Sequence, residues 1–185
     1  MEKLTLAKAK EILAKHTTEQ HLFTHAAAVS SAMEAMAEHF GADKEHWAAI
    51  GYLHDVDFEK FPTEHCQHVR ELLEPEGVSA EDIDTIISHG YGLTSGDVKP
   101  ETDCQKSLFA VDELTGIVHA YSLMRPEKFE GMSVKSLKKK FKDKRFAAKC
   151  NREVITKGAE DLGMDLGVLM ELCIKGMSAH AEELQ

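Results

Sequence analysis

The sequence contains no pair of cysteines in CxxC spacing, because Cys66, Cys104, Cys150 and Cys173 lie far apart. This spacing argues against a zinc knuckle, a thioredoxin-like motif and a disulfide framework, so we interpret the four as buried or incidental thiols. No apolar run approaches the roughly 18 residues needed to cross a bilayer, and no apolar signal-peptide block follows Met1. We therefore expect no membrane segment, a cytoplasmic location and reduced cysteines.

Sustained alternation of apolar and polar residues is also missing, and no segment is enriched in β-branched residues, which argues against a sheet. Helical periodicity dominates instead, so the sequence predicts an all-α fold, a compact helical bundle. A chain of 185 residues with 43% hydrophobic residues can bury one substantial core. We therefore expect a single domain over residues 1–185, with a core at about residues 19–125 and a helical C-terminal extension at about residues 126–185.

Basic residues are scarcer than acidic ones, and the formal net charge is −10. This balance disfavours nucleic acid, including a duplex, as the main partner. One segment, residues 135–145, runs against the balance with a strongly positive charge. The segment could attract a phosphate-bearing ligand or could form the solvated face of a helix, and charge runs are more often solvated.

Apolar periodicity and punctuating residues divide the chain into helices. Gly41 is suited to end a long helix, Asp43 and Ser79 to cap the starts of two others, and Pro62 to stand in a first turn. The glycines of residues 89–100 predict a loop that begins at His89. The expected helices cover residues 4–15, 19–40, 62–73, 79–88 and 106–123, with one after Asp43, one through the basic segment, and others near 151–162 and 166–183.

The most informative feature is the pair His54-Asp55, which follows an apolar helical run. His54 comes four residues after Ile50 and seven after Trp47, so it lies on the apolar face of that helix. His25 shares a helical face with apolar residues at offsets of −3, +4 and +8. Both histidines are therefore expected to point inward from separate helices.

Asp112 is also expected to face the core, because Leu108, Phe109, Thr115 and Gly116 stand at helical-neighbour offsets from it. A buried carboxylate is costly without a cation or hydrogen bonds, and a bound metal removes that cost. Taken alone, Asp112 could equally be half of a buried ion pair. A lone histidine on an apolar face is likewise more often a hydrogen-bonded core residue than a ligand. The combination favours one or two divalent ions of iron, manganese, zinc or nickel.

These positions resemble the H…HD…D signature of the HD-domain superfamily of metal-dependent phosphohydrolases, which here spans about half the chain. Two further histidines, ten residues after the doublet and 24 residues beyond that, resemble the extra histidines of dinuclear members. The resemblance implies one metal at His25, His54, Asp55 and Asp112, and a second at His65 and His89. Asp55 would bridge the two metals and be the catalytic residue. His68, one turn beyond His65, is a less favoured substitute for it.

The chain departs from better-known branches at Phe58, which stands where the HD-GYP and HDIG forms have a lysine and some mononuclear nucleotidases have a glutamate. Neither branch's acid/base residue can therefore be carried over. Residues 110–116, by contrast, resemble the final-aspartate helix of small bacterial HD hydrolases. Asp57 or Glu59 could handle a proton, although each could equally be a helix-end charge.

The resemblance implies hydrolysis of a small phosphorylated substrate, with a nucleotide as the expected class, by metal-activated water. Lys60, Arg70, Arg125 or the basic segment could bind phosphate. Two alternatives use the same residues: a di-iron oxygenase similar to inositol-oxygenase-like HD proteins, and a non-catalytic module that binds a nucleotide or metal. The sequence leaves open the substrate, the metal, the number of ions and the oligomeric state.

Overall fold

The computed structural model describes residues 3–94 and 96–184. Within these residues the chain forms helices and no strand, apart from one isolated bridge between Tyr91 and Gly96. The α-helices are α1 (Leu6–His16), α2 (Gln20–Phe40), α3 (Lys44–Leu53), α4 (Val69–Leu73), α5 (Ala80–Ser88), α6 (Asp103–Met124), α7 (Val134–Lys142), α8 (Arg152–Asp161) and α9 (Leu166–Ala179). Short 3-10 helices cover Pro62–Glu64, Glu74–Glu76 and Ala181–Leu184. The predicted all-α fold is confirmed.

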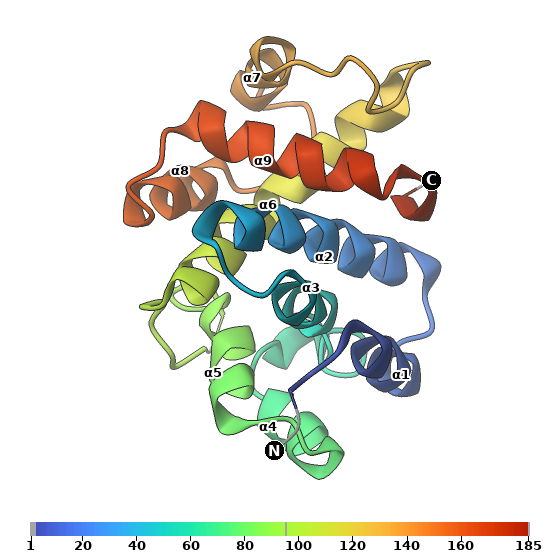
Figure 1. Ribbon diagram of the computed structural model, residues 1–185, viewed down its shortest axis with the longest axis vertical. Helices are drawn as coiled ribbons and strands as arrows, with labels where there is room; N and C mark the ends of the chain where they lie inside the picture. The colour runs from blue at the N-terminus through green and yellow to red at the C-terminus, as the bar shows by residue number, and fades with distance from the viewer. Residues whose placement is uncertain (1–2, 95, 185) are drawn as a thin grey trace.

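Helix α2 is central to the bundle and packs against α3, α6 and α9 (Figure 1). Its inward residues are mostly alanine, and the larger ones among them, Val29, Met33 and Met36, are fully buried. Figure 1 shows α7, α8 and α9 on one side of α2, and α1, α3, α4 and α5 on the other. The helices on both sides bury their apolar faces in one continuous core.

Two glycines let neighbouring helices approach α2 closely. A Cβ atom on Gly176 of α9 would lie 2.2 Å from the main-chain oxygen of Ser31, and one on Gly51 of α3 would lie 3.0 Å from the main-chain oxygen of Val29. Larger side chains would therefore push α9 and α3 away from α2. The close contact at Gly51 positions the C-terminal end of α3, which carries the His54-Asp55 pair, next to α2.

The caps at helix ends agree with the predictions. Gly41, after α2, has φ 66°, in the left-handed region that glycine adopts without strain. The Asp43 side chain accepts a hydrogen bond from the main-chain N–H of His46 at the start of α3. The Ser79 side chain caps α5 in the same way, by accepting a hydrogen bond from the main-chain N–H of Asp82. Helix α6 begins a few residues earlier than expected, because Thr102 and Gln105 form a capping box.

The predicted helix over residues 62–73 is wrong. The segment is divided into a 3-10 turn at Pro62–Glu64, an irregular stretch, and the short helix α4. Cys66 lies in that stretch with φ 75°, a conformation that an α-helix cannot contain. The last helix also ends earlier than expected, at Ala179, and a 3-10 turn follows it.

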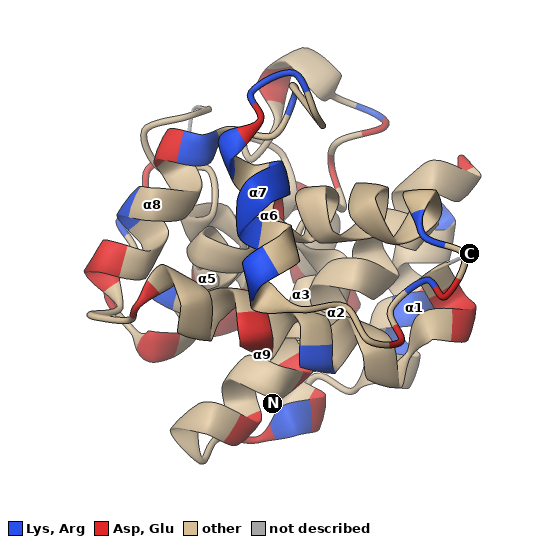
Figure 2. Ribbon diagram, turned by 90° about the horizontal axis from the view of Figure 1, so that it is seen from above, with Lys and Arg blue, Asp and Glu red and all other residues tan. Residues whose placement is uncertain are grey.

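The C-terminal helices contribute to the same core as the rest of the chain. Leu169, Met170 and Met177 of α9 are fully buried and belong to the cluster that also contains α2 and α3. Helix α7 inserts the fully buried Leu137, while its lysines are exposed or half-buried and form a basic patch (Figure 2). The division into a core and an extension stays a prediction. None of the described helices is long and apolar enough to cross a membrane.

Candidate metal centre

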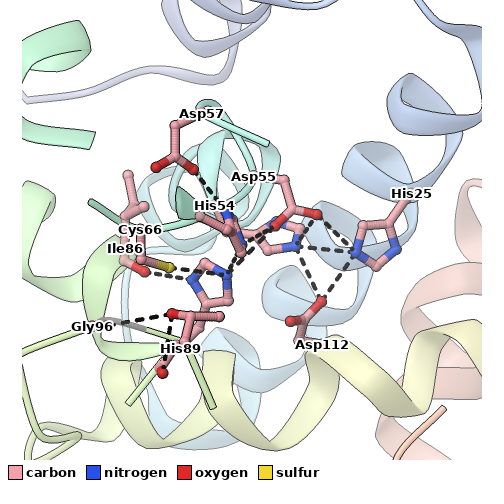
Figure 3. A network of polar contacts seen from close by, with 12 residues as sticks. His25, His54, Asp55, Asp57, Cys66, Ile86, His89, Gly96 and Asp112 are labelled. Carbon is pink, nitrogen blue, oxygen red and sulfur yellow. Dashed lines mark hydrogen bonds and ion pairs between the residues drawn. The ribbon is translucent and has the colours of Figure 1, made fainter. Parts of the chain in front are cut away.

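The six residues proposed as metal ligands converge on one place in the bundle, and Figure 3 labels five of them, all except His65. They come from helices α2, α3, α5 and α6 and from the irregular segment after α3. His25 lies within α2, His54 and Asp55 directly follow α3, His65 follows the first 3-10 turn, His89 directly follows α5, and Asp112 lies within α6. Their convergence meets the expectation from sequence, while their role as ligands stays a prediction.

One group of donor atoms forms what we term the first half of the centre: His25, His54, Asp112 and one oxygen of Asp55. The Nε2 atoms of His25 and His54 are 3.1 Å apart, and Oδ1 of Asp112 lies 3.0 and 3.1 Å from them. Oδ2 of Asp55 lies 3.4 and 3.3 Å from the same two nitrogens. Four donor atoms thus surround one small space.

The second half consists of His65, His89 and the other oxygen of Asp55. The Nε2 atoms of the two histidines are 3.0 Å apart, and Oδ1 of Asp55 lies 3.0 Å from His65 and 3.4 Å from His89. Asp55 therefore directs one carboxylate oxygen into each half. This is the arrangement that a carboxylate bridging two ions requires.

The Nδ1 atoms of three histidines face oxygen acceptors outside the centre. Nδ1 of His54 lies 2.6 Å from the main-chain oxygen of Gly51, and Nδ1 of His89 lies 2.5 Å from that of Ile86. Nδ1 of His65 lies 2.7 Å from Oδ1 of Asp57. Because these oxygens accept, each Nδ1 donates, which assigns the tautomer that leaves the Nε2 lone pair directed inward. Metal-binding histidines are commonly oriented in this way.

The carboxylates of Asp55 and Asp112 in the centre need positive charge beside them to offset their burial. Burial alone lowers the pKa of His54, but Asp55 and Asp112 outweigh burial and raise that pKa to about 9. Burial is likewise outweighed at His65 and His89, whose pKa values are raised by their anionic neighbours. At Asp112 burial raises the pKa, but the His54 charge and the hydrogen bonds from the imidazoles hold it well below its usual range. Protons or a metal can supply this charge.

The spacing of the donor atoms fits a metal. Atoms that bind one ion at about 2.1 Å lie about 3.0 to 3.4 Å from each other in octahedral or tetrahedral geometry. The nitrogen–nitrogen and nitrogen–oxygen separations in both halves fall in this range. The imidazole and carboxylate donors also suit first-row divalent metals. The residues present therefore fit one or two such ions.

The HD-domain family model matches residues 22–117, more than half of the chain. The chain belongs to the HD-domain family. Comparisons with curated proteins and with solved structures find no match. All six converging residues fall inside the matched range, and HD domains bind divalent metals. Family membership together with the His/Asp cluster supports a hydrolase-type function that depends on metal.

Asp57 is a residue of this HD domain whose position the sequence left open. Its side chain is fully buried, and it accepts hydrogen bonds from Nδ1 of His65 and from the main-chain N–H of His68. Asp57 thus orients His65 from outside the centre. Glu59, the other acidic residue considered for proton handling, instead accepts hydrogen bonds from Thr18 on the surface.

His68 does not replace His65 in the centre. Its ring stacks on Phe61 and its nitrogens contact Glu64 and Glu71 on the surface. Cys66, by contrast, lies beside the second half, where its sulfur is 3.9 Å from Nε2 of His89. The sequence predicts a buried or incidental thiol here, and Cys66 is buried, but nothing in the spacing of the four cysteines indicates that it lies beside this centre.

A cleft of about 320 Å³ opens onto the centre. Its wall includes Phe58 and Glu113, and also Lys149 and Cys150 from the segment between α7 and α8. Burial and the charge of the neighbouring Asp112 raise the pKa of Glu113. The C-terminal third, which lies outside the family match, therefore forms part of the wall of the cleft that leads to the centre.

Arg152 holds the segment that carries Lys149 and Cys150. Its guanidinium donates hydrogen bonds to main-chain oxygens in α7 and in the segment that follows α7. These include the oxygens of Phe141 at 3.1 Å, Ala147 at 2.7 Å and Cys150 at 3.0 Å. One half-buried side chain thus ties the end of α7 to the following segment. This network fixes the part of the cleft wall contributed by the C-terminal helices.

The three cations outside the basic segment that were considered for phosphate binding have other contacts. Lys60 lies 2.8 Å from Nδ1 of His16, and Arg70 pairs with Asp84 at 3.3 Å. Arg125 donates to main-chain oxygens in the turn after α6. None of the three lines the cleft at the centre.

Proposed function

We propose that this HD-domain protein is a metal-dependent phosphohydrolase that acts on a small phosphorylated substrate, with a nucleotide as the first class to test. The observation that carries the proposal is the carboxylate of Asp55, whose two oxygens face two separate sets of histidine nitrogens at the base of a cleft. A bound divalent ion would lower the pKa of a coordinated water and offset charge on phosphoryl oxygens.

The residues of the centre have distinct tasks in this proposal. Asp55 supplies one oxygen to each half and so fixes the distance between them. His54 and His89 are fully or almost fully buried, which keeps their donor atoms in place. Asp55 and Asp112 are partly exposed, which gives substrate and water access from one side. Glu113, in the cleft wall and with a raised pKa, is positioned to hold or release a proton.

The cleft favours a small anionic substrate. Its volume of about 320 Å³ suits a single small molecule and is at the lower end of typical ligand pockets. Lys149 at its rim offers a positive charge to a phosphate group. The net charge of −10 disfavours a nucleic-acid duplex, as the sequence already indicated.

A screen of phosphoesters tests the proposal. Protein stripped with a chelator is assayed on nucleotides and other small phosphoesters before and after addition of manganese, zinc, nickel or iron(II). We expect phosphate release that requires metal and that the chelator removes. Full activity in the stripped protein would contradict the mechanism.

The same experiment separates the alternatives. Oxygen consumption by the iron-loaded protein that depends on the added compound would favour a di-iron oxygenase. Saturable binding of a nucleotide without turnover, with any of the four metals, would favour a binding module. A hydrolase instead works with redox-inert zinc and consumes no oxygen.

A further inference from the structure

Cys66 belongs to a cluster of potential ligands that the six-residue pattern does not include. The ligand atoms of His65, Cys66 and His89 all lie within 4.8 Å of one another. The thiol is buried, with 4% of the residue exposed, and its sulfur lies 3.9 Å from Nε2 of His89. Figure 3 shows the sulfur beside His89 and at the same centre as Asp55.

The backbone at Cys66 is strained in a way that holds the thiol at this place. Cys66 has φ 75°, one of three positive φ values at non-glycine residues in the described chain, and it is the buried one of the three. Such a conformation is sparsely populated by non-glycine residues and is common at functional sites. It also lets two consecutive residues, His65 and Cys66, direct donor atoms toward His89.

Gly90 makes room for the sulfur. A Cβ atom at this position would lie 2.6 Å from Sγ of Cys66 and 2.4 Å from Oγ1 of Thr94. Any larger residue after His89 would therefore displace the thiol from the second half. The glycine that follows the ligand candidate His89 is thus required by Cys66, in addition to any role in the loop.

We propose that Cys66 binds metal as a thiolate and completes a second-half set of His65, Cys66, His89 and Oδ1 of Asp55. The first half offers two imidazoles and two carboxylates, whereas this set offers two imidazoles, one thiolate and one carboxylate. Thiolates favour zinc and disfavour manganese and magnesium. The two halves therefore differ in metal preference, with zinc selected by the second.

The distance between the sulfur and Nε2 of His89 is compatible with this set. A thiolate and an imidazole nitrogen bound to one zinc ion at about 2.3 and 2.05 Å lie about 3.6 Å apart at the tetrahedral angle. The sulfur–nitrogen distance of 3.9 Å corresponds to a wider angle, of about 127° at the same bond lengths. The inference rests on the metal centre of the proposed function but not on phosphoester hydrolysis.

Cobalt(II) is the probe, because its spectrum reports ligands without any assay of turnover. Stripped wild-type protein is titrated with cobalt(II) and followed by absorption. We expect visible d–d bands from both halves and a near-ultraviolet sulfur-to-cobalt charge-transfer band from the second. Cys66→Ser should remove the charge-transfer band, keep d–d bands from the first half, and weaken zinc binding to the second half by at least about 10-fold.

Cys150→Ser is the matched control, since Cys150 lines the same cleft and should leave the band unchanged. Wild-type d–d bands without a charge-transfer band would overturn the role of Cys66, as would a band lost in Cys150→Ser but kept in Cys66→Ser. Where Cys66→Ser does not fold, a charge-transfer band shared by wild type and Cys150→Ser supports the role of Cys66, and a band lost in Cys150→Ser overturns it. Absence of all d–d bands would overturn the metal centre itself and with it the proposed function.

Discussion

The two halves of the candidate centre differ in the elements that hold them. In the first half, His25 and Asp112 stand inside the long helices α2 and α6, and His54 ends α3. In the second half, His89 ends a short helix and His65 lies in an irregular segment. Helices that are packed on several sides fix the first half, whereas local hydrogen bonds fix the second.

This difference affects how each half responds to change. Side chains on packed helices keep their positions when one neighbour is altered, because the core sets the helix positions. His65 instead is oriented by a local hydrogen bond from its Nδ1 to the buried Asp57 and by an edge contact with the ring of Phe58. The first half is therefore expected to lose metal only when a ligand is removed, and the second also when a supporting residue is removed.

Asp55→Asn should have the largest effect, because it weakens both halves at once. The substitution keeps the shape but removes the charge that faces four histidine nitrogens. We expect turnover to fall by more than about 100-fold and metal content to drop in both halves, since even supporting residues are worth 10- to 100-fold. Elemental analysis and phosphate release check this. Unchanged metal content would refute a bridging role.

Asp112→Asn should affect the first half alone. If Asp112 is a ligand, the variant stays folded and loses first-half metal and turnover together, by about 10- to 100-fold or more. If Asp112 is instead half of a buried ion pair, the variant is destabilised by about 3–5 kcal/mol and keeps its metal. Melting temperature and bound metal, measured on one sample, separate these outcomes. Asp84→Asn, on the surface, is the control.

Asp57→Asn should affect the second half alone. The amide is a weaker acceptor for Nδ1 of His65 than the buried carboxylate is. We expect affinity for the second-half metal to fall by about 10-fold, with the first half unchanged. Stepwise metal titration by calorimetry measures the two affinities. Equal losses in both halves would show that the halves are not held independently.

The same contrast explains what the sequence could predict. His25, His54 and Asp112 stand on apolar helical faces, so periodicity alone indicated that they point inward. His65 and His89 carry no comparable periodic signal, and their assignment to a second metal rests on the resemblance to dinuclear HD proteins. Their convergence with the others depends on tertiary packing, which periodicity does not contain.

The parts that sequence missed lie in irregular segments. Residues 62–73 were expected to be one helix, and the positive φ of Cys66 that divides it has no sequence signal in a non-glycine residue. Lys149 and Cys150 reach the cleft only because α7 and α8 fold back over α6, a long-range contact. The helix caps at Asp43 and Ser79 were predictable, because capping is local.

Metal-free protein should lose stability as pH rises from about 6.5 to 9. The folded-state pKa of His54 is raised to about 9, above the value of 6.5 in an unfolded chain. Its contribution is therefore complete below about pH 6.5 and is lost through pH 9, by roughly 3 kcal/mol. The lowered pKa values of Asp55 and Asp112 add a contribution that is constant over this range.

Zinc-saturated protein should show the opposite trend, because metal binding requires deprotonated nitrogens and strengthens as pH rises. Thermal melts at several pH values, with and without zinc, measure both trends. His54→Gln in the metal-free state should lose part of the slope. A metal-free protein whose stability increases between pH 6.5 and 9 would show that protons do not occupy the first half.

Lys149→Gln should have the smallest effect, because this cation belongs to neither half. Lys149 is exposed at the rim of the cleft, and exposed charges contribute about 1 kcal/mol or less. We expect KM for a phosphorylated substrate to rise about two- to threefold, with kcat and metal content unchanged, since the lost contact is made equally in ground state and transition state. Lys139→Gln, on the solvated face of α7, is the matched control and should leave KM unchanged. A fall in kcat in Lys149→Gln would instead place the cation at the reacting phosphate, and equal KM values for the two variants would remove it from substrate binding.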